Sequence, residues 1–192
     1  MALRQLGVPV EEYYAYEIDK YAIQVTQHNF PDTIQCGDVF AADFTKHRGV
    51  DALIGGSPCT HWSICQHKDR ETTASGIGWD LFSQYVRALE EAQPQWFLYE
   101  NNKSMAPAIR QQISETFGFE PICINSALLS GQNRERLYWV GRRNAAGTYD
   151  RVGVQQPQDR GIILADVLDT VTSEKCYALK SLTEREMSYM VR

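Results

Sequence analysis

The sequence feature that most restricts the fold is a short, almost continuous apolar run at residues 95–99, which read QWFLY. A run of this length is far too short to span a membrane and is typical of a strand buried on both faces of a parallel sheet. Parallel strands need a crossover between them, usually a helix. Residues 79–92 supply such a helical pattern, with a stripe of core-facing residues at Leu81, Phe82, Tyr85, Val86 and Leu89.

Strand and helix patterns alternate along most of the chain. Asp19 suits the N-cap of a helix that closes before Pro31. Alternation of this kind predicts an α/β fold with a doubly wound, mostly parallel sheet. The expected strands are residues 13–18, 33–36, 51–54, 95–99, 120–125 and 137–141, and the expected helices are the end of a helix at 1–7, then 20–29, 79–92 and about 104–117.

Composition excludes several classes of protein. The chain has 192 residues, 43% hydrophobic and 22% charged, as expected for one domain with a substantial core. Five scattered cysteines, with no signal peptide and no apolar run of membrane length, favour reduced thiols in a cytoplasmic protein with no membrane partner. The net charge of -5 argues against a general nucleic-acid coat but leaves room for a local basic face within residues 103–143.

The turn at residues 55–59, which read GGSPC, follows the expected strand at 51–54. In open α/β sheets, ligands and chemistry collect at the carboxyl ends of the strands. Proline fixes the backbone before the thiol of Cys59, and the glycines permit close approach of a ligand. On these residues alone, a nucleophilic cysteine and an ordinary buried thiol are about equally well supported.

Three acids follow other strands at the same edge. Glu17 could accept hydrogen bonds from ribose hydroxyls, and Asp38 could contact an adenine amino group, so together they indicate an adenosyl cofactor. Glu100 ends the apolar strand at 95–99. Taken singly, Glu17 and Asp38 are each better explained as a solvated acid at a strand end.

Two other chemistries remain open around Cys59. Cys59, His61, Cys65 and His67 could ligate zinc, although structural zinc sites usually pair their ligands across two separate knuckles. Cys59 with His61 or His67 as base could also perform acyl transfer, but no orienting partner is evident. In the segment 132–136, which reads QNRER, two arginines two residues apart would point the same way on an extended backbone and could hold a phosphate or a base carbonyl.

Taken together, these motifs resemble those of the C5-cytosine DNA methyltransferases. Gly56-Ser-Pro-Cys59 is similar to the family's nucleophile motif, Glu100-Asn101 to its Glu-Asn-Val motif, and residues 132–136 to its Gln-x-Arg-x-Arg motif. The resemblance covers about residues 1–141 and implies a Rossmann-like fold that uses S-adenosylmethionine to methylate C5 of cytosine. The implied partner is double-stranded DNA with the target cytosine flipped out, bound by a monomer of bacterial or phage origin, as in restriction-modification systems.

The resemblance also assigns roles to single residues. It implies that Cys59 adds to C6 of the ring, that Glu100 holds and protonates N3, and that Arg136 contacts O2 with support from Arg134. Residues 57–78 would form the loop that closes over the flipped base. The implied cofactor residues are Glu17, Ile18, Asp38, Val39, Pro58 and Leu81, those of the substrate loop are Ser57, Thr60, Ser63 and Gln132, and no metal is implied.

The sequence departs from the family pattern in two respects. Asn102 stands where the family usually has valine after Glu-Asn. The family's Phe-x-Gly-x-Gly loop and the strand before it are expected ahead of Met1, and without that mid-sheet strand two neighbouring strands should have unpaired edges. We therefore expect a partial catalytic domain at residues 1–147, and a linker with the start of a target-recognition region at 148–192. Turnover should be weak or absent, and a non-catalytic DNA-binding or regulatory fragment is the alternative.

Overall fold

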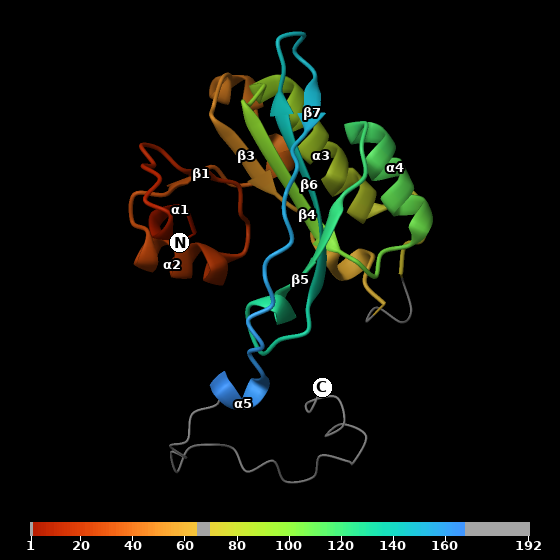
Figure 1. Ribbon diagram of the computed structural model, residues 1–192. Helices are drawn as coiled ribbons and strands as arrows, with labels where there is room; N and C mark the ends of the chain where they lie inside the picture. The colour runs from red at the N-terminus through yellow and green to blue at the C-terminus, as the bar shows by residue number, and fades with distance from the viewer. Residues whose placement is uncertain (1, 65–69, 168–192) are drawn as a thin grey trace.

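A computed structural model describes residues 2–64 and 70–167, which form two β-sheets with helices packed beside them (Figure 1). The amphipathic helix suggested by residues 182–190 lies outside the described residues. The strands are β1 (Tyr14–Ala15), β2 (Ile34–Gln35), β3 (Ala52–Gly55), β4 (Trp96–Asn102), β5 (Ile122–Asn125), β6 (Glu135–Arg143) and β7 (Tyr149–Arg151). The helices are α1 (Ala2–Gln5), α2 (Lys20–Asn29), α3 (Ile77–Ala92), α4 (Pro107–Phe117) and α5 (Leu164–Val167), with 3-10 turns η1 (Val39–Ala41), η2 (Phe44–His47), η3 (Cys59–His61) and η4 (Ser126–Leu128).

The larger sheet contains five strands, in the order β3-β4-β6-β5, with β7 beside β6. β3 and β4 are parallel, whereas β6 is antiparallel to β4, β5 and β7. Within this sheet, all the strands except β6 therefore run in one direction, and the predicted mostly parallel α/β sheet is confirmed. Sequence analysis missed β7, because a three-residue strand after a turn carries no periodic signal.

The smaller sheet consists of β1 and β2, which are parallel. Among the described residues β1 pairs only with β2, and β3 pairs only with β4 on one of its sides, so each has an unpaired edge, as the sequence predicted. The two sheets are nevertheless near one another. Tyr16, which follows β1, and Leu53 of β3 both pack against a small cluster formed by Phe44, Ala88 and Ala92.

The helix ends follow from local chemistry. Asp19 caps α2 by accepting hydrogen bonds from the backbone N–H groups of Tyr21 and Ala22, both at 2.8 Å, which confirms the predicted N-cap. α4 has Pro107 at its first position and ends at Gly118, whose φ of 81° is the left-handed conformation that glycine adopts most easily.

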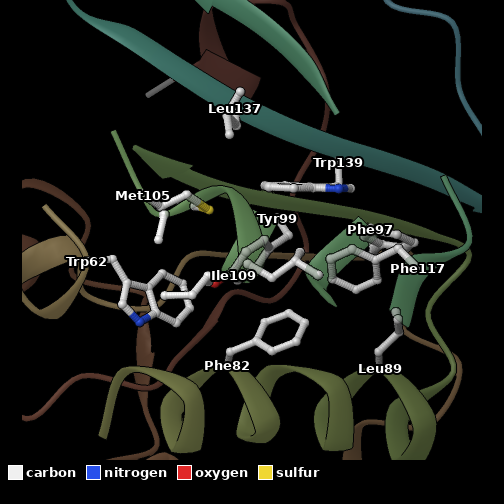
Figure 2. Packing of buried hydrophobic residues seen from close by; sticks show 12 residues of the cluster. Trp62, Phe82, Leu89, Phe97, Tyr99, Met105, Ile109, Phe117, Leu137 and Trp139 are labelled. Carbon is white, nitrogen blue, oxygen red and sulfur yellow. The ribbon is translucent and has the colours of Figure 1, made fainter. Parts of the chain in front are cut away.

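The main core lies between the larger sheet and α3 and α4, which cover the same face of it (Figures 1 and 2). The predicted stripe on α3 is confirmed in its central residues, since Phe82 and Leu89 are buried in this core and Tyr85 and Val86 pack against it. Trp62 lies at one end of the cluster and Leu89 at the other (Figure 2).

The expectation that β4 is buried on both faces is wrong. Phe97 and Tyr99 point into the main core and are 1% and 0% exposed, but Trp96 on the other face is 36% exposed and Leu98 is half-buried. The reason is that α3 and α4 lie on one face only. An apolar run in the sequence shows that a strand is hydrophobic, but it does not show whether helices cover one face of the strand or both.

Candidate active site at the ends of β3, β4 and β6

The register between β3 and β4 positions the Cys59 turn. Gly55 pairs with Tyr99, so that the next residue, Gly56, lies beside Glu100 as the chain leaves the sheet. A Cβ added at Gly56 would lie 2.4 Å from the backbone oxygen of Glu100, a distance that only glycine permits. The turn that carries Cys59 therefore begins in direct contact with the backbone of Glu100.

A buried hydrogen-bond network supports this turn from below. The Ser57 hydroxyl lies 2.6 Å from the Tyr99 hydroxyl, and the Asn101 side-chain amide donates to the Ser57 carbonyl oxygen at 3.1 Å. Tyr99 and Asn101 are 0% and 1% exposed. Burial raises the pKa of Tyr99 to about 12, so its hydroxyl stays neutral and available for hydrogen bonding throughout the physiological range.

Glu100 and Arg136 form an ion pair on the opposite face of the sheet. Arg136 Nε lies 2.9 Å from Glu100 Oε1, and the two side chains are 17% and 37% exposed. They reach one another diagonally, because Glu100 is opposite Tyr138 and Arg136 is opposite Asn102 in the β4–β6 register. The structure thus brings two of the predicted catalytic residues into contact.

Arg134 is held at the start of β6 by backbone contacts. Its N–H donates to Asn125 Oδ1 at 2.9 Å, and its carbonyl oxygen accepts from the N–H of Ser126 at 3.0 Å. The Arg134 side chain is exposed, as is Gln132, two residues earlier. Asn125, which sequence analysis did not single out, is therefore the residue that ties the end of β5 to the arginine segment.

Tyr138 is a second residue that sequence analysis missed. It lies opposite Glu100, and burial together with the Glu100 carboxylate raises its pKa, while Arg136 and Arg134 act in the other direction. Tyr138 is thus close enough to Glu100, Arg136 and Arg134 to interact with each of them electrostatically. The sequence could have indicated Tyr138, because it is two residues after Arg136 on the same strand, and residues two apart on a strand share a face.

Three of the predicted substrate-loop residues, Ser57, Thr60 and Ser63, lie in or next to η3. Ser57 belongs to the buried network, whereas Pro58 and Thr60 are exposed and Ser63 is half-buried. The predicted zinc set includes Cys65 and His67, which lie outside the described residues. Within residues 2–64 and 70–167, no group of three or more His, Cys, Asp or Glu residues is arranged to hold a metal ion, and no helix is long and apolar enough to cross a membrane.

Two of the predicted cofactor residues are acids that follow the strands of the smaller sheet, Glu17 after β1 and Asp38 after β2. Glu17 Oε1 accepts from the N–H groups of Ile18 and Asp19, both at 2.8 Å, and Asp38 caps η1 by accepting from Phe40 N–H. The Ile18 side chain is 74% exposed. A carboxylate after each of two parallel strands, with an exposed apolar side chain beside one, suits the hydroxyls of a ribose and the face of an adenine ring.

Arg87 connects this part of the chain to α3. Its guanidinium donates to the carbonyl oxygens of Val39 and Ala42, both at 2.8 Å, and lies over the Phe44 ring. Val39 itself packs against the smaller cluster, and Leu81 lies half-buried on α3. Arg87 therefore helps to set where η1, with Asp38 at its N-cap, lies relative to the larger sheet.

Comparison with known proteins agrees with this arrangement. Orphan methyltransferase M.SPRI of Bacillus phage SPR is 36% identical over 154 residues, which are 74% of this chain and 34% of the phage protein. Type II methyltransferase M1.ScrFI of Lactococcus lactis is 28% identical over 177 residues, 86% of this chain and 44% of that protein. DNA (cytosine-5-)-methyltransferase M.ApeKI of Aeropyrum pernix is 39% identical over 83 residues, 42% of this chain and 18% of that protein.

Structural comparison supports the fold. A crystal structure from Escherichia coli, described as a DNA modification methyltransferase encoded within a prophage, superimposes with a TM-score of 0.52 at 23% identity, over 68% of this chain and 39% of the other. The chain spans about a third of the length of the phage relatives it matches. The sequence profile of the C-5 cytosine-specific DNA methylases matches residues 1–190, and the chain therefore belongs to this family.

Proposed function

We propose that this chain carries the residues for methyl transfer from S-adenosylmethionine to C5 of a cytosine flipped out of double-stranded DNA. The observation that carries the proposal is the contact of three elements at one sheet edge. Gly56, at the start of the Cys59 turn, touches the backbone of Glu100, and the Glu100 carboxylate is paired with Arg136. Membership of the family supports the same chemistry.

In the proposed mechanism the Cys59 thiolate forms a bond to C6 of the cytosine ring, and the electrons of the C5–C6 double bond move toward N3. Glu100 delivers a proton to N3, so the ring does not accumulate negative charge. Arg136 leaves its ion pair to bind O2, the ring substituent next to N3, and Arg134 supports the pocket. The adjacent side chains of Glu100 and Arg136 would thus contact N3 and O2, which are adjacent on the cytosine ring.

When bound, the cofactor would supply an electrophilic methyl group to C5, and its sulfur would keep the electrons of the broken S–CH3 bond. Loss of the C5 proton to solvent, return of the N3 proton to the Glu100 carboxylate and cleavage of the bond from Cys59 to C6 would then restore the aromatic ring and the free thiolate. Glu17, Asp38 and Ile18 would hold the adenosyl part, with Val39, Pro58 and Leu81 completing the contacts. Ser57, Thr60, Ser63 and Gln132 would face the substrate.

We further propose that turnover by this chain alone is weak. The carboxylates offered to the cofactor follow a two-stranded sheet, and such sheets are marginally stable without further pairing. Among the described residues, β1 and β3 each have an edge with no strand paired to it. If this is correct, adding a family segment with a strand and the Phe-x-Gly-x-Gly loop should raise cofactor binding, measured by calorimetry.

The chemistry is tested with a DNA duplex containing 5-fluorocytosine, S-adenosylmethionine and the added segment. Fluorine on C5 cannot leave as a proton does, so the enzyme should remain bound to DNA through Cys59. Cys59→Ala should abolish the adduct, and Cys123→Ala, which changes a half-buried thiol on β5, should retain it. Failure to form any adduct would refute the assignment of Cys59 as nucleophile. Cofactor-independent DNA binding would instead favour a regulatory fragment.

A further inference from the structure

Glu71 lies where the loop that follows Cys59 returns to the core, and its carboxylate occupies the N-terminus of α3. The N-cap residue of α3 is Gly76, which has no side chain to accept a hydrogen bond from the first turn. Glu71 takes this role from outside the helix, because Gly78 N–H lies 3.3 Å from Oε1 and 3.2 Å from Oε2. A negative charge at this end of a helix is also favourable for the helix dipole.

The same carboxylate contacts the segment that bears Cys59. Trp62 Nε1 donates to Glu71 Oε2 at 3.0 Å, and the Glu71 backbone N–H donates to the His61 carbonyl oxygen at 2.9 Å. His61 Nδ1 lies 3.7 Å from Glu71 Oε1. Because Cys59–His61 is a single 3-10 turn, these contacts fix its carboxyl-terminal end.

The Glu71 carboxylate is closely packed by its neighbours. A Cβ at Gly78 would come within 2.6 Å of Glu71 Oε2 and 2.5 Å of Trp62 Nε1, and the Glu71 side chain is only 16% exposed. Arg70 adds a second tie, since its guanidinium donates to the carbonyl oxygens of Trp62 at 3.2 Å and Ser104 at 2.6 Å. The Cys59 turn is therefore joined to α3 on one side and to the segment after β4 on the other.

We infer that Glu71 is a positioning residue, which holds the backbone of the Cys59 turn against α3. This inference rests on the proposed function insofar as Cys59 is the nucleophile. Glu71 acts through Trp62 and His61 and does not touch substrate. A simple helix cap would stabilise α3 without restricting Cys59, and the two roles can be separated by experiment.

The experiment measures alkylation of individual cysteines by iodoacetamide under native conditions at about pH 8, near the ordinary thiol pKa. Mass spectrometry gives the rate at Cys59 separately from Cys36 and Cys123, which report loosening elsewhere. Glu71→Gln is isosteric, but its amide can accept only through one oxygen, and its NH2 group opposes a neighbouring N–H donor. Glu90→Gln is the matched control, because it removes the same charge from an exposed position near the other end of α3.

We expect Glu71→Gln to raise the Cys59 rate by about threefold or more through more frequent local opening, with Cys36, Cys123 and the Glu90→Gln protein unchanged. Trp62→Phe removes the indole donor together with part of a buried ring and should act in the same direction, with Cys36 and Cys123 reporting any general loosening. In the double variant, Cys59 should be alkylated no faster than in the faster single variant, because both substitutions remove the same hydrogen bond between Trp62 and Glu71.

The inference is overturned if the Cys59 rate is unchanged while Glu71→Gln lowers the urea midpoint, since Glu71 would then be only a helix cap. Equal acceleration at all three cysteines would also overturn it, as global loosening. Should Glu71→Gln fail to fold, Trp62→Phe decides by the same criterion. The proposed function fails separately, through the absence of a 5-fluorocytosine adduct in the protein with Glu71 intact.

Discussion

Replacing Tyr99 by phenylalanine removes one hydroxyl from beneath the Cys59 turn and leaves the ring in place. The Tyr99 side chain is 0% exposed, and its hydroxyl is hydrogen-bonded to Ser57 at 2.6 Å. Loss of a buried hydrogen bond typically costs about 1 kcal/mol, and Asn101 Nδ2 remains 3.3 Å from the Ser57 hydroxyl as a partner. We therefore expect Tyr99→Phe to lower the free energy of unfolding by about 1 kcal/mol at neutral pH.

The effect should change sign in alkali. Burial raises the pKa of Tyr99 from 10.0 to about 12, so the unfolded chain loses this proton at lower pH than the folded chain does. The stabilisation from a raised pKa is present below the unfolded value and is lost as the pH rises toward the folded value. Between the two, the loss is about 1.4 kcal/mol per pH unit. The wild-type advantage should therefore disappear near about pH 11.

The assay is urea unfolding followed by circular dichroism, with both proteins measured at intervals from neutral pH into alkali. Titrating groups that do not interact with Tyr99 contribute equally to the two proteins and cancel in the difference. Tyr13→Phe is the control, since Tyr13 is 48% exposed and its replacement should change stability little at any pH. A difference between wild type and Tyr99→Phe that stays constant with pH would refute the claim that burial holds this hydroxyl neutral.

Three further substitutions test other contacts. Gly56→Ala should lower the melting temperature strongly, because the added Cβ meets the Glu100 backbone. Gly153→Ala is the control and should be tolerated, because the space around Gly153 is open. Equal effects of the two substitutions would contradict the close approach at Gly56. Arg87→Lys should speed amide hydrogen exchange at Val39–Ala41 by removing the bonds to Val39 and Ala42, and unchanged exchange would show that those bonds do not hold η1. Lys103→Ala should leave the urea midpoint unchanged, since its 2.6 Å pair with Glu135 is exposed, and a clear loss would contradict the low value expected for surface pairs.

Much of the fold was predictable because its signals are local. The bounds of α2 follow from Asp19 at one end and the segment before Pro31 at the other, and both act within a few residues of the helix. The core stripe of α3 follows from the helical period. The strand ends that carry Glu17, Asp38 and Cys59 follow from short apolar runs that stop at polar or glycine residues.

The one-sided burial of β4 and the existence of β7 could not be predicted in the same way. Both depend on which elements pack together, and that information is not contained in a local period. The ion pair between Glu100 and Arg136 joins strands separated by a helix and another strand. Sequence analysis named both residues but could not establish their contact from the chain itself.

The sequence by itself determined the chemical groups of the candidate site and the strands that carry them, because reactive residues at strand ends are readable one motif at a time. Only the tertiary structure decided how those groups are supported. Tyr99 beneath Ser57, Tyr138 opposite Glu100, and Glu71 between Trp62 and α3 are each set by register or by packing across the chain. Such contacts exist only after the sheet has formed, because the residues that make them have no local relationship in the sequence.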